Sequence, residues 1–462
     1  MKNTQNDLNK LNMRFLNKTM LTVLVTGLFM ANCDSLLDTE PAQSIDGSIA
    51  LETEANVLTV LNGAYDGFSD DDMFGGEYQM EADLMSTDDV LPEIEWAGSF
   101  ADPRQIFDKT ILVDNGQVSQ TWTESYDAIN RANNVLSALD VIEDAATRTQ
   151  VEAEAKFIRG VTYFYLVQFY AKPFSDGNAA SNPGVPLVLT PTTGIDESSN
   201  VSRNTVAEVY AQILSDLTDA EAGLPASNGG YATSHAAAAF LSRVYLQQAD
   251  YANARDAANR VISSGAFSLT ATYVDAFNNQ ENSTEDVFAI QIDAQDGAHS
   301  LNTFFADPAF GGRGDIFITP AHLAAYEAGD ERIDAMNEDS TVTKKWDDFT
   351  ANIPVIRLAE LHLTRAEANA ELGTAIGAAP QDDLDAIRAR VGLPSTPATV
   401  ASILAERRLE LAFEGQWLHD LKRRQSSIGS IPFDANRIVW PIPERETIVN
   451  PNLTQNPGYI AN

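Results

Sequence analysis

The feature that most restricts how this chain can fold is a pair of helix-forming segments joined by a short turn, within residues 233–265. Apolar residues recur there at spacings of three and four in two consecutive runs, which is the period of an amphipathic helix. Asp250 can cap the second helix by accepting a backbone N–H, and Gly265 can close it in the left-handed conformation. Small alanines let the two helices approach closely. The stretch therefore predicts an antiparallel helical hairpin, which is a scaffold without an obvious nucleophile, base or metal ligand.

Helical periodicity returns through most of the chain, so a mainly α fold is expected, with helix pairs like those of tetratricopeptide repeats. Residues 69–114 and 267–350 lack clear periodicity and are expected to be irregular insertions in a single domain, residues 51–462. Long irregular stretches are more often functional than accidental. The other expected helices are 51–68, 118–142, 147–169, 203–224, 355–372, 381–391 and 397–424.

The start of the chain has the pattern of an export signal. Arg14 and Lys18 precede an apolar run that is too short to span a bilayer but suits a secretory signal. Residues 1–32 are therefore predicted to be a signal peptide, and translation starts at either Met1 or Met13.

The apolar run ends at Cys33, the single cysteine of the chain, which cannot form an internal disulfide. The preceding residues resemble a bacterial lipobox, although Asn32 is larger than the residue usually found there. Lipidation of Cys33 is the prediction, and an incidental thiol is the alternative. Residues 33–50 would then tether the domain to a membrane without a spanning helix.

The charge balance excludes one class of partner. The chain has 30 basic and 66 acidic residues, a formal net charge of −36. Nucleic acid is not expected as a partner, because its phosphates would be repelled rather than neutralised. The acidity is interpreted as surface solvation, with a cationic ligand as the alternative.

Two polar or aromatic patterns could be mistaken for binding sites. Asn130 and Asn133 could form a binding pair, but at a helix contact they are expected to hydrogen-bond backbone instead. The aromatic run at residues 163–170 could be a ligand stripe, but its helical spacing favours core packing.

The charged residues of the C-terminal part have a structural interpretation too. Arg407, Arg408, Glu410 and Glu414 are expected to form an ion-pair network rather than a charged site. The histidines show no pair at metal-ligand spacing and no calcium-binding loop is recognisable, so neither a metal nor a cofactor is predicted. The five histidines are His235, His299, His322, His362 and His419.

Seven short pieces of the sequence are weak individually and informative in their order. They are CDSLLD at 33–38, WTESYDAINRAN at 122–133, EAKFIRGVTYFYLVQFYAKP at 154–173, RLAELHLTRAE at 357–367, ERRLELAFEGQWLHDL at 406–421, WPIPERE at 440–446 and NPNLTQNPGY at 450–459. Together they resemble the RagB/SusD family, the starch-utilisation-system D-like lipoproteins of the outer membrane. The resemblance covers nearly all of the chain after the signal segment.

That resemblance implies a SusD-like fold, in which tetratricopeptide-like helix pairs carry a more irregular ligand-binding part. It implies a lipid-anchored protein on the extracellular face of the outer membrane, which captures oligosaccharides, or in some cases peptides. The partner it implies is a TonB-dependent, SusC-like transporter. Neither the resemblance nor the helices provide a catalytic set, so an enzyme is not expected.

Two other functions compete with nutrient capture. A surface glycoside hydrolase would use a pair of carboxylates, but with 66 acidic residues their abundance is no evidence. A tetratricopeptide-type adaptor would bind a protein partner and no small ligand.

Sugar-binding sites use exposed aromatic rings that stack on the C–H faces of the sugar. Neighbouring polar groups form hydrogen bonds with the sugar hydroxyl groups. The stretches 72–107 and 298–349 offer such residues on expected loops. Trp96 is the first candidate, because it lies between Glu95 and Gly98 without the periodic companions of a core residue. Local packing is the alternative for every candidate. The other candidates are Tyr78, Phe100, Phe304, Arg313 and Trp346.

Overall fold

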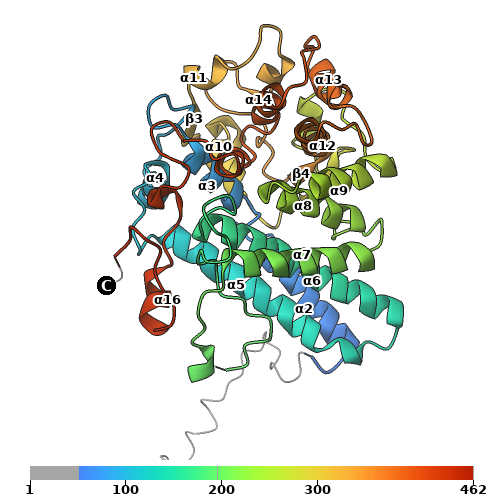
Figure 1. Ribbon diagram of the computed structural model, residues 1–462, viewed down its shortest axis with the longest axis vertical. Helices are drawn as coiled ribbons and strands as arrows, with labels where there is room; N and C mark the ends of the chain where they lie inside the picture. Colours follow the sequence, from blue (N-terminus) through green and yellow to red (C-terminus); the bar gives the residue numbers. More distant parts are fainter. Residues whose placement is uncertain (1–50, 195, 461–462) are drawn as a thin grey trace, which may run out of the picture. The chain divides into compact units, whose positions relative to one another are not determined.

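The helical hairpin expected within residues 233–265 is present in the computed structural model (Figure 1). Its two helices are α8 (Ser234–Gln247) and α9 (Tyr251–Ser264). Asp250 caps α9, since its carboxylate accepts the backbone N–H of Asn253 at 3.3 Å. Gly265 ends the helix in the left-handed conformation, with φ of 67°. The hairpin and both of its caps are therefore confirmed.

The structure describes residues 51–194 and 196–460. The predicted signal peptide at 1–32 and the tether at 33–50, with Cys33 at its start, lie outside the described residues and stay predictions. In the part of the chain that is described, no helix is both long and apolar enough to cross a bilayer.

From Thr53 onward the chain forms one compact unit, in which helices that follow one another in sequence pack side by side. α5 packs on α6, α6 on α7 and α7 on α8, and α9 then packs on α12 (Figure 1). This succession of helix pairs confirms the mainly α prediction. The long helices besides α8 and α9 are α2 (Glu54–Phe68), α5 (Gly116–Ser137), α6 (Ala145–Tyr170), α7 (Val206–Gly223), α12 (Leu358–Leu372), α13 (Pro380–Arg390) and α14 (Val400–Glu410).

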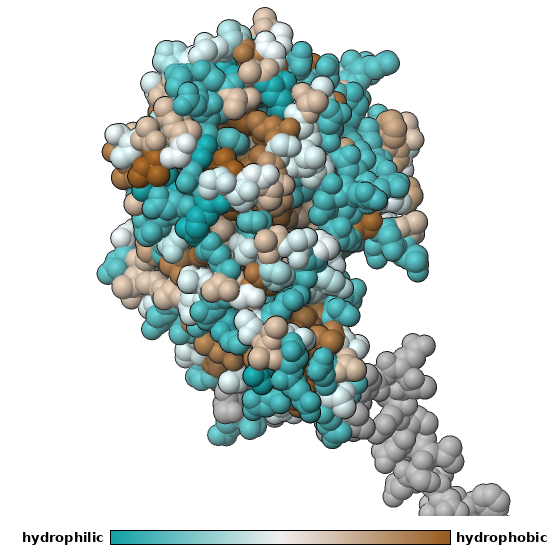
Figure 2. All heavy atoms as spheres, turned by 90° about the vertical axis from the view of Figure 1, so that its right-hand side faces the viewer, coloured by the Kyte–Doolittle hydropathy of each residue, from teal (hydrophilic) through white to brown (hydrophobic). Residues whose placement is uncertain are grey.

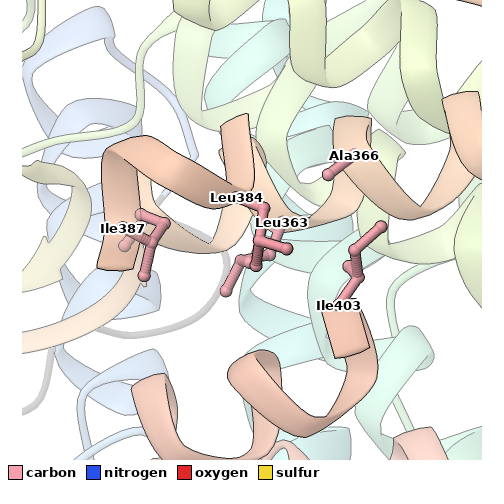
Figure 3. Close-up of a cluster of buried hydrophobic side chains, with 6 residues drawn as sticks. Leu363, Ala366, Leu384, Ile387 and Ile403 are labelled. Carbon is pink, nitrogen blue, oxygen red and sulfur yellow. The ribbon is translucent and has the colours of Figure 1, made fainter. Parts of the chain in front are cut away.

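Apolar side chains between the helices hold the unit together. Figure 3 shows one cluster, in which α12, α13 and α14 meet. Each fully buried leucine or isoleucine of this kind stabilises the fold by about 1.5–3 kcal/mol. The aromatic run 163–170 of α6 is buried as well, which confirms its predicted core role. The cluster of Figure 3 consists of Ala359, Leu363, Ala366, Leu384, Ile387 and Ile403.

Residues 69–114 and 267–350 are more ordered than predicted. They contribute short helices, both strands of the β1–β3 sheet, and strand β2, which pairs with β4 just after the second stretch. Helix α3 was not expected because polar residues alternate with apolar ones at 77–84, so the segment lacks the period of an amphipathic helix, and residues 77–85 are all buried. The strands are β1 (Ile94–Trp96), β2 (Asp286–Ile290), β3 (Ile316–Ile318) and β4 (Ile353–Arg357).

The remaining elements are short. The α-helices are α3 (Glu77–Ser86), α4 (Ala101–Phe107), α10 (Ser300–Phe305), α11 (Pro320–Leu323), α15 (Trp417–Arg423) and α16 (Glu444–Val449). The 3-10 helices are η2 (Leu139–Val141), η3 (Glu197–Ser199), η4 (Val274–Ala276), η5 (Pro308–Phe310), η6 (Glu331–Ala335) and η7 (Asn436–Ile438).

The four charged residues of the predicted network all form ion pairs, but with partners from other segments rather than with one another. Arg357, the last residue of β4, donates to Glu285 at 2.6 Å, to Glu410 at 3.1 Å and to Glu414 at 2.8 Å. Burial disfavours the charged form of the Glu410 carboxylate and would raise its pKa. The positive charges of Arg390, Arg357 and a further arginine have the larger effect and lower this pKa to about 2. These groups join the residue before β2 to the ends of β4, α13 and α14.

The neighbouring arginines and the asparagine pair also have structural partners. Arg407 is buried and donates to Asp420 at 2.9 Å, whereas Arg408 pairs with Glu93 nearer the surface. Asn133 donates to the carbonyl oxygen of residue 188 at 2.9 Å, and the Asn130 side chain accepts a backbone N–H from residue 192. The interpretation of both patterns as structural is confirmed.

Candidate ligand-binding site

The short β1–β3 ladder brings the two aromatic-rich stretches of the sequence together. The strands are antiparallel, and Ile94 lies opposite Ile318 while Trp96 lies opposite Ile316. Their outward residues, Glu95 and Phe317, face each other on the exposed side. Segments separated by more than two hundred residues thus form one surface.

Four of the six candidate residues meet at this surface. The ring of Phe304, on α10, lies 5.6 Å from that of Trp96 and 6.2 Å from that of Phe100, centroid to centroid. The Arg313 guanidinium lies 4.7 Å from the centre of the Phe100 ring. We call these four residues the aromatic cluster.

The members of the aromatic cluster differ in how much of each side chain is exposed to a ligand. Phe100 is 48% exposed, Phe304 is half-buried, and 42% of the Arg313 side chain is exposed. Arg313 donates from Nε to Asp315 at 2.7 Å, which holds the guanidinium over the phenyl ring. The surface therefore presents two phenyl rings beside a guanidinium, whose carboxylate partner Asp315 is buried. The rings can stack on a sugar ring while the guanidinium donates hydrogen bonds to its hydroxyl groups.

Trp96 supports this surface from below. Only 2% of it is exposed, because the alternation of β1 turns its side chain inward. Gly98 is required beside it, since a Cβ there would lie 2.5 Å from the indole ring and 2.8 Å from Asp315. The expectation that Trp96 is an exposed loop residue is wrong.

Tyr78 and Trp346 are also buried, contrary to the expectation of exposed loop aromatics. Tyr78 lies on α3 with no exposed surface, its hydroxyl 2.6 Å from that of Ser125. Trp346 is 3% exposed and packs edge-on against Phe277. Both side chains are core residues that a ligand cannot reach in this structure.

A groove beside η5 contains an aromatic residue that was not among the candidates. Phe310 is 51% exposed and lines a hollow of about 250 Å³ together with Asp307, Asp339 and Asp347. Lys344 also lines it. A second hollow of about 340 Å³ shares two of these lining residues, Lys344 and Asp347. We call the first hollow the Phe310 groove.

Charges in the Phe310 groove are partly shielded from water. Burial raises the pKa of Asp347 to about 6, with Lys344 lowering it and Asp307 raising it further. Asn302 positions this wall of the groove, since its amide donates to the carbonyl oxygen of Trp346 at 2.7 Å. The signal that could have indicated the groove is a phenylalanine at the end of a proline-led turn, before Gly311 with φ of 85°.

Two other hollows are lined by none of the six candidate ligand-binding residues. One of about 30 Å³ between Asp83 and Arg408 has room for a water molecule rather than for a sugar ring. A wider one of about 750 Å³ lies between residues 109–114 and the C-terminal segment, where Leu112 and Tyr459 are among its lining residues.

The histidines of the described chain have structural neighbours. His362 lies 2.6 Å from a carboxylate oxygen of Asp383, and burial lowers the pKa of His322 to about 4. Across residues 51–194 and 196–460, no group of three or more histidine, cysteine or acidic side chains is arranged to hold a metal ion.

Comparison with known proteins agrees with the mainly helical fold. Residues 36–246 match a SusD-like family described as starch-binding and associating with the outer membrane. Residues 334–431 match the SusD family. The chain is SusD-like in sequence. The resemblance found in the sequence pieces is thereby confirmed.

A curated relative and two solved structures extend this SusD-like assignment. SusD-like protein P2 of Formosa agariphila is 26% identical and aligns with 96% of this chain and 100% of its own. A SusD superfamily protein of Bacteroides thetaiotaomicron is 25% identical with a TM-score of 0.76, over 88% of this chain and 100% of that one. A laminarin-binding SusD-like protein, 24% identical, has a TM-score of 0.70 over the same shares, which shows a common fold.

Proposed function

We propose that this SusD-like protein captures oligosaccharides at the cell surface and passes them, uncleaved, to a TonB-dependent SusC-like transporter. The observation that carries the proposal is the aromatic cluster, in which Phe100 and Phe304 present ring surface beside the Arg313 guanidinium. The starch-binding description of the matching family and the laminarin-binding neighbour support a carbohydrate as ligand. Peptide capture is a variant of the same role.

The proposal assigns the residues different roles. Phe100 and Phe304 stack on sugar rings, Arg313 bonds hydroxyl groups, and Trp96 holds Phe304 in place from below. The Phe310 groove receives a further part of the glycan chain, with its carboxylates accepting hydrogen bonds from sugar hydroxyl groups.

The test begins with an array of plant, algal and bacterial glycans, followed by calorimetry with the best ligand. Phe304→Ala and Phe100→Ala are expected to weaken binding about tenfold or more each, because each removes a stacking surface. Phe349→Ala is the control, since Phe349 is 41% exposed and lines none of the grooves described above. Wild-type affinity in both variants, or release of shorter sugars from the bound glycan, would contradict the proposal.

The proposed anchor is the acylated thiol of Cys33, which would hold the protein on the outer membrane without a spanning segment. Cys33→Ser is expected to move the protein from the membrane fraction to the soluble fraction, while glycan affinity stays unchanged. Metabolic labelling with a fatty-acid analogue checks acylation directly. A Cys33→Ser protein that remains in the membrane fraction would show that another feature anchors it.

A further inference from the structure

A second aromatic groove lies apart in sequence from the aromatic cluster, between α2, the turn before α8, and the end of β2. Its volume is about 370 Å³, and Asn62, Tyr65 and Tyr231 are among its lining residues. Phe68 and Phe288 also line it and are buried. We call it the Tyr231 groove. None of its lining residues belongs to the aromatic cluster or to the Phe310 groove.

Two tyrosines form one wall of the Tyr231 groove. Their ring centroids are 4.8 Å apart and the ring planes are inclined at 56°. Tyr65 is the supporting member, since its hydroxyl oxygen accepts the backbone N–H of Ala232 at 3.1 Å. Tyr231 leans on it and remains 44% exposed. The pair therefore offers one ring to a ligand and uses the other to fix it.

The turn that carries Tyr231 is held rigidly. The Asn228 amide donates to Glu154 at 3.1 Å and to the carbonyl oxygen of Ala232 at 3.0 Å. Gly230 packs against Gln291, and a Cβ at this glycine would lie 2.5 Å from the glutamine side chain. A ring that is already held in position loses little entropy when a ligand binds, which favours recognition over incidental exposure.

Polar groups stand beside the exposed ring. Asn62 accepts a hydrogen bond from the Tyr231 hydroxyl at 3.3 Å, and its amide group also carries donors. Asp66 lines the same groove, and 87% of its side chain is exposed. An aromatic face flanked by an amide and a carboxylate suits a sugar ring, whose C–H face stacks while its hydroxyls donate and accept hydrogen bonds.

We propose that the Tyr231 groove is a second carbohydrate-binding site, which holds a short part of a neutral glycan. This inference rests on the proposed function. One exposed ring gives weak affinity for a short oligosaccharide. A polysaccharide that engages the aromatic cluster as well gains avidity, because its second contact forms at a high effective concentration.

The experiment compares variants of the full chain on polysaccharides. Native gels containing laminarin, starch, xylan or mannan identify a polymer that retards the wild type, and calorimetry then gives its affinity. Tyr231→Ala is expected to weaken binding of that polymer about tenfold or more, whereas Tyr231→Phe retains it because the ring is kept. Asn62→Ala, a second variant that leaves the ring in place, is expected to weaken binding in the same direction. Tyr245→Ala, which removes a half-buried tyrosine of α8, is the matched control.

The variants test the second site separately from the proposed function. If Phe304→Ala loses affinity while Tyr231→Ala and Asn62→Ala bind like the wild type, the second site is overturned and the proposed function stands. If no polymer retards the wild type, both are overturned. Loss in Tyr231→Ala and Asn62→Ala, with circular dichroism and melting unchanged, supports the second site.

Discussion

At the scale of single residues, Glu81 of α3 is an acidic side chain enclosed by the protein and shielded from water. Its carboxyl is fully buried and neither oxygen has a hydrogen-bonding partner in the described structure. Burial, together with the nearby carboxyls of Glu77 and Asp72, raises the pKa of Glu81 well above its usual value. The folded protein therefore keeps this proton to a higher pH than the unfolded chain does.

We expect Glu81→Gln to stabilise the protein at about pH 8 by roughly 1–3 kcal/mol. Because the folded pKa is raised, the carboxyl favours folding fully below its unfolded pKa of about 4.3, and this contribution is lost as pH rises through the folded pKa. Glutamine cannot ionise, so the stability of the variant does not fall with rising pH on account of this residue. Urea unfolding at several pH values measures it, with Glu143→Gln at an exposed position as control. Parallel pH profiles for wild type and Glu81→Gln would contradict the assigned protonation.

Residue types alone predicted the stretches that form the aromatic cluster, but not which side chains face outward. Phe100, Phe304 and Arg313 reach the surface, whereas Tyr78 is buried against Ser125, a residue 47 positions away. Burial of this kind depends on contacts between distant segments, which periodicity within one segment does not report. Trp96 is buried for the same reason, since its strand pairs with β3.

At the scale of elements, the strongest predictions came from segments whose local signals agree with their packing. In α9, apolar period, N-cap and C-cap glycine all indicate one helix, and the structure has it. In α3, the segment is buried on every side and follows Gly76 with φ of 137°, so neither period nor side-chain cap marks its start. Burial on every side does not by itself hide a helix, since the second half of α6 is equally buried and was predicted from its period, so α3 was missed for want of period and cap.

The cap of α9 can be tested by Asp250→Ala, which removes the acceptor for the backbone N–H of Asn253. The free energy of unfolding is expected to fall by about 1 kcal/mol, and Asp250→Ser is expected to restore most of it, because serine also caps helices well. Urea denaturation measures both variants. Equal loss in the alanine and serine variants would show that the effect does not come from capping.

The junction of β4 with α14 depends on Arg357, which is fully buried between three carboxylates. Arg357→Met leaves those carboxylates without their shared partner, so stability is expected to fall by about 3–5 kcal/mol. Arg445→Met is the control, because 70% of the Arg445 side chain is exposed and its pairing contributes little. A loss below about 1 kcal/mol in Arg357→Met would contradict a structural role for this network.

At the scale of the whole molecule, the helix pairs form a frame, and strands β1 and β3 bring the candidate site together. The β1–β3 ladder joins residues from the first quarter of the chain to residues from its third quarter, and the aromatic cluster lies at that junction. The hairpins could be predicted from local period. The junction could not, because three-residue strands carry too few positions to show an alternation.

The charge of the molecule bears on the kind of glycan that the proposed function allows. The formal net charge is −36, and hydrophilic residues predominate on the face shown in Figure 2. Arg313, the cation of the aromatic cluster, is already paired with Asp315. A polyanionic glycan would therefore be repelled, and most strongly at low ionic strength, where surface charges are least screened.

We therefore expect the affinity for a neutral glycan to change less than about twofold between roughly 20 mM and 500 mM NaCl. An anionic polymer such as alginate is expected to bind more weakly than neutral glycans and to lose further affinity at the lower salt concentration. Calorimetry in both buffers measures these affinities, with uncharged dextran as the control for nonspecific binding. Tight alginate binding that strengthens as salt is lowered would contradict it. Such a result would require a local positive potential strong enough to overcome the net charge, and the paired guanidinium of Arg313 does not supply one.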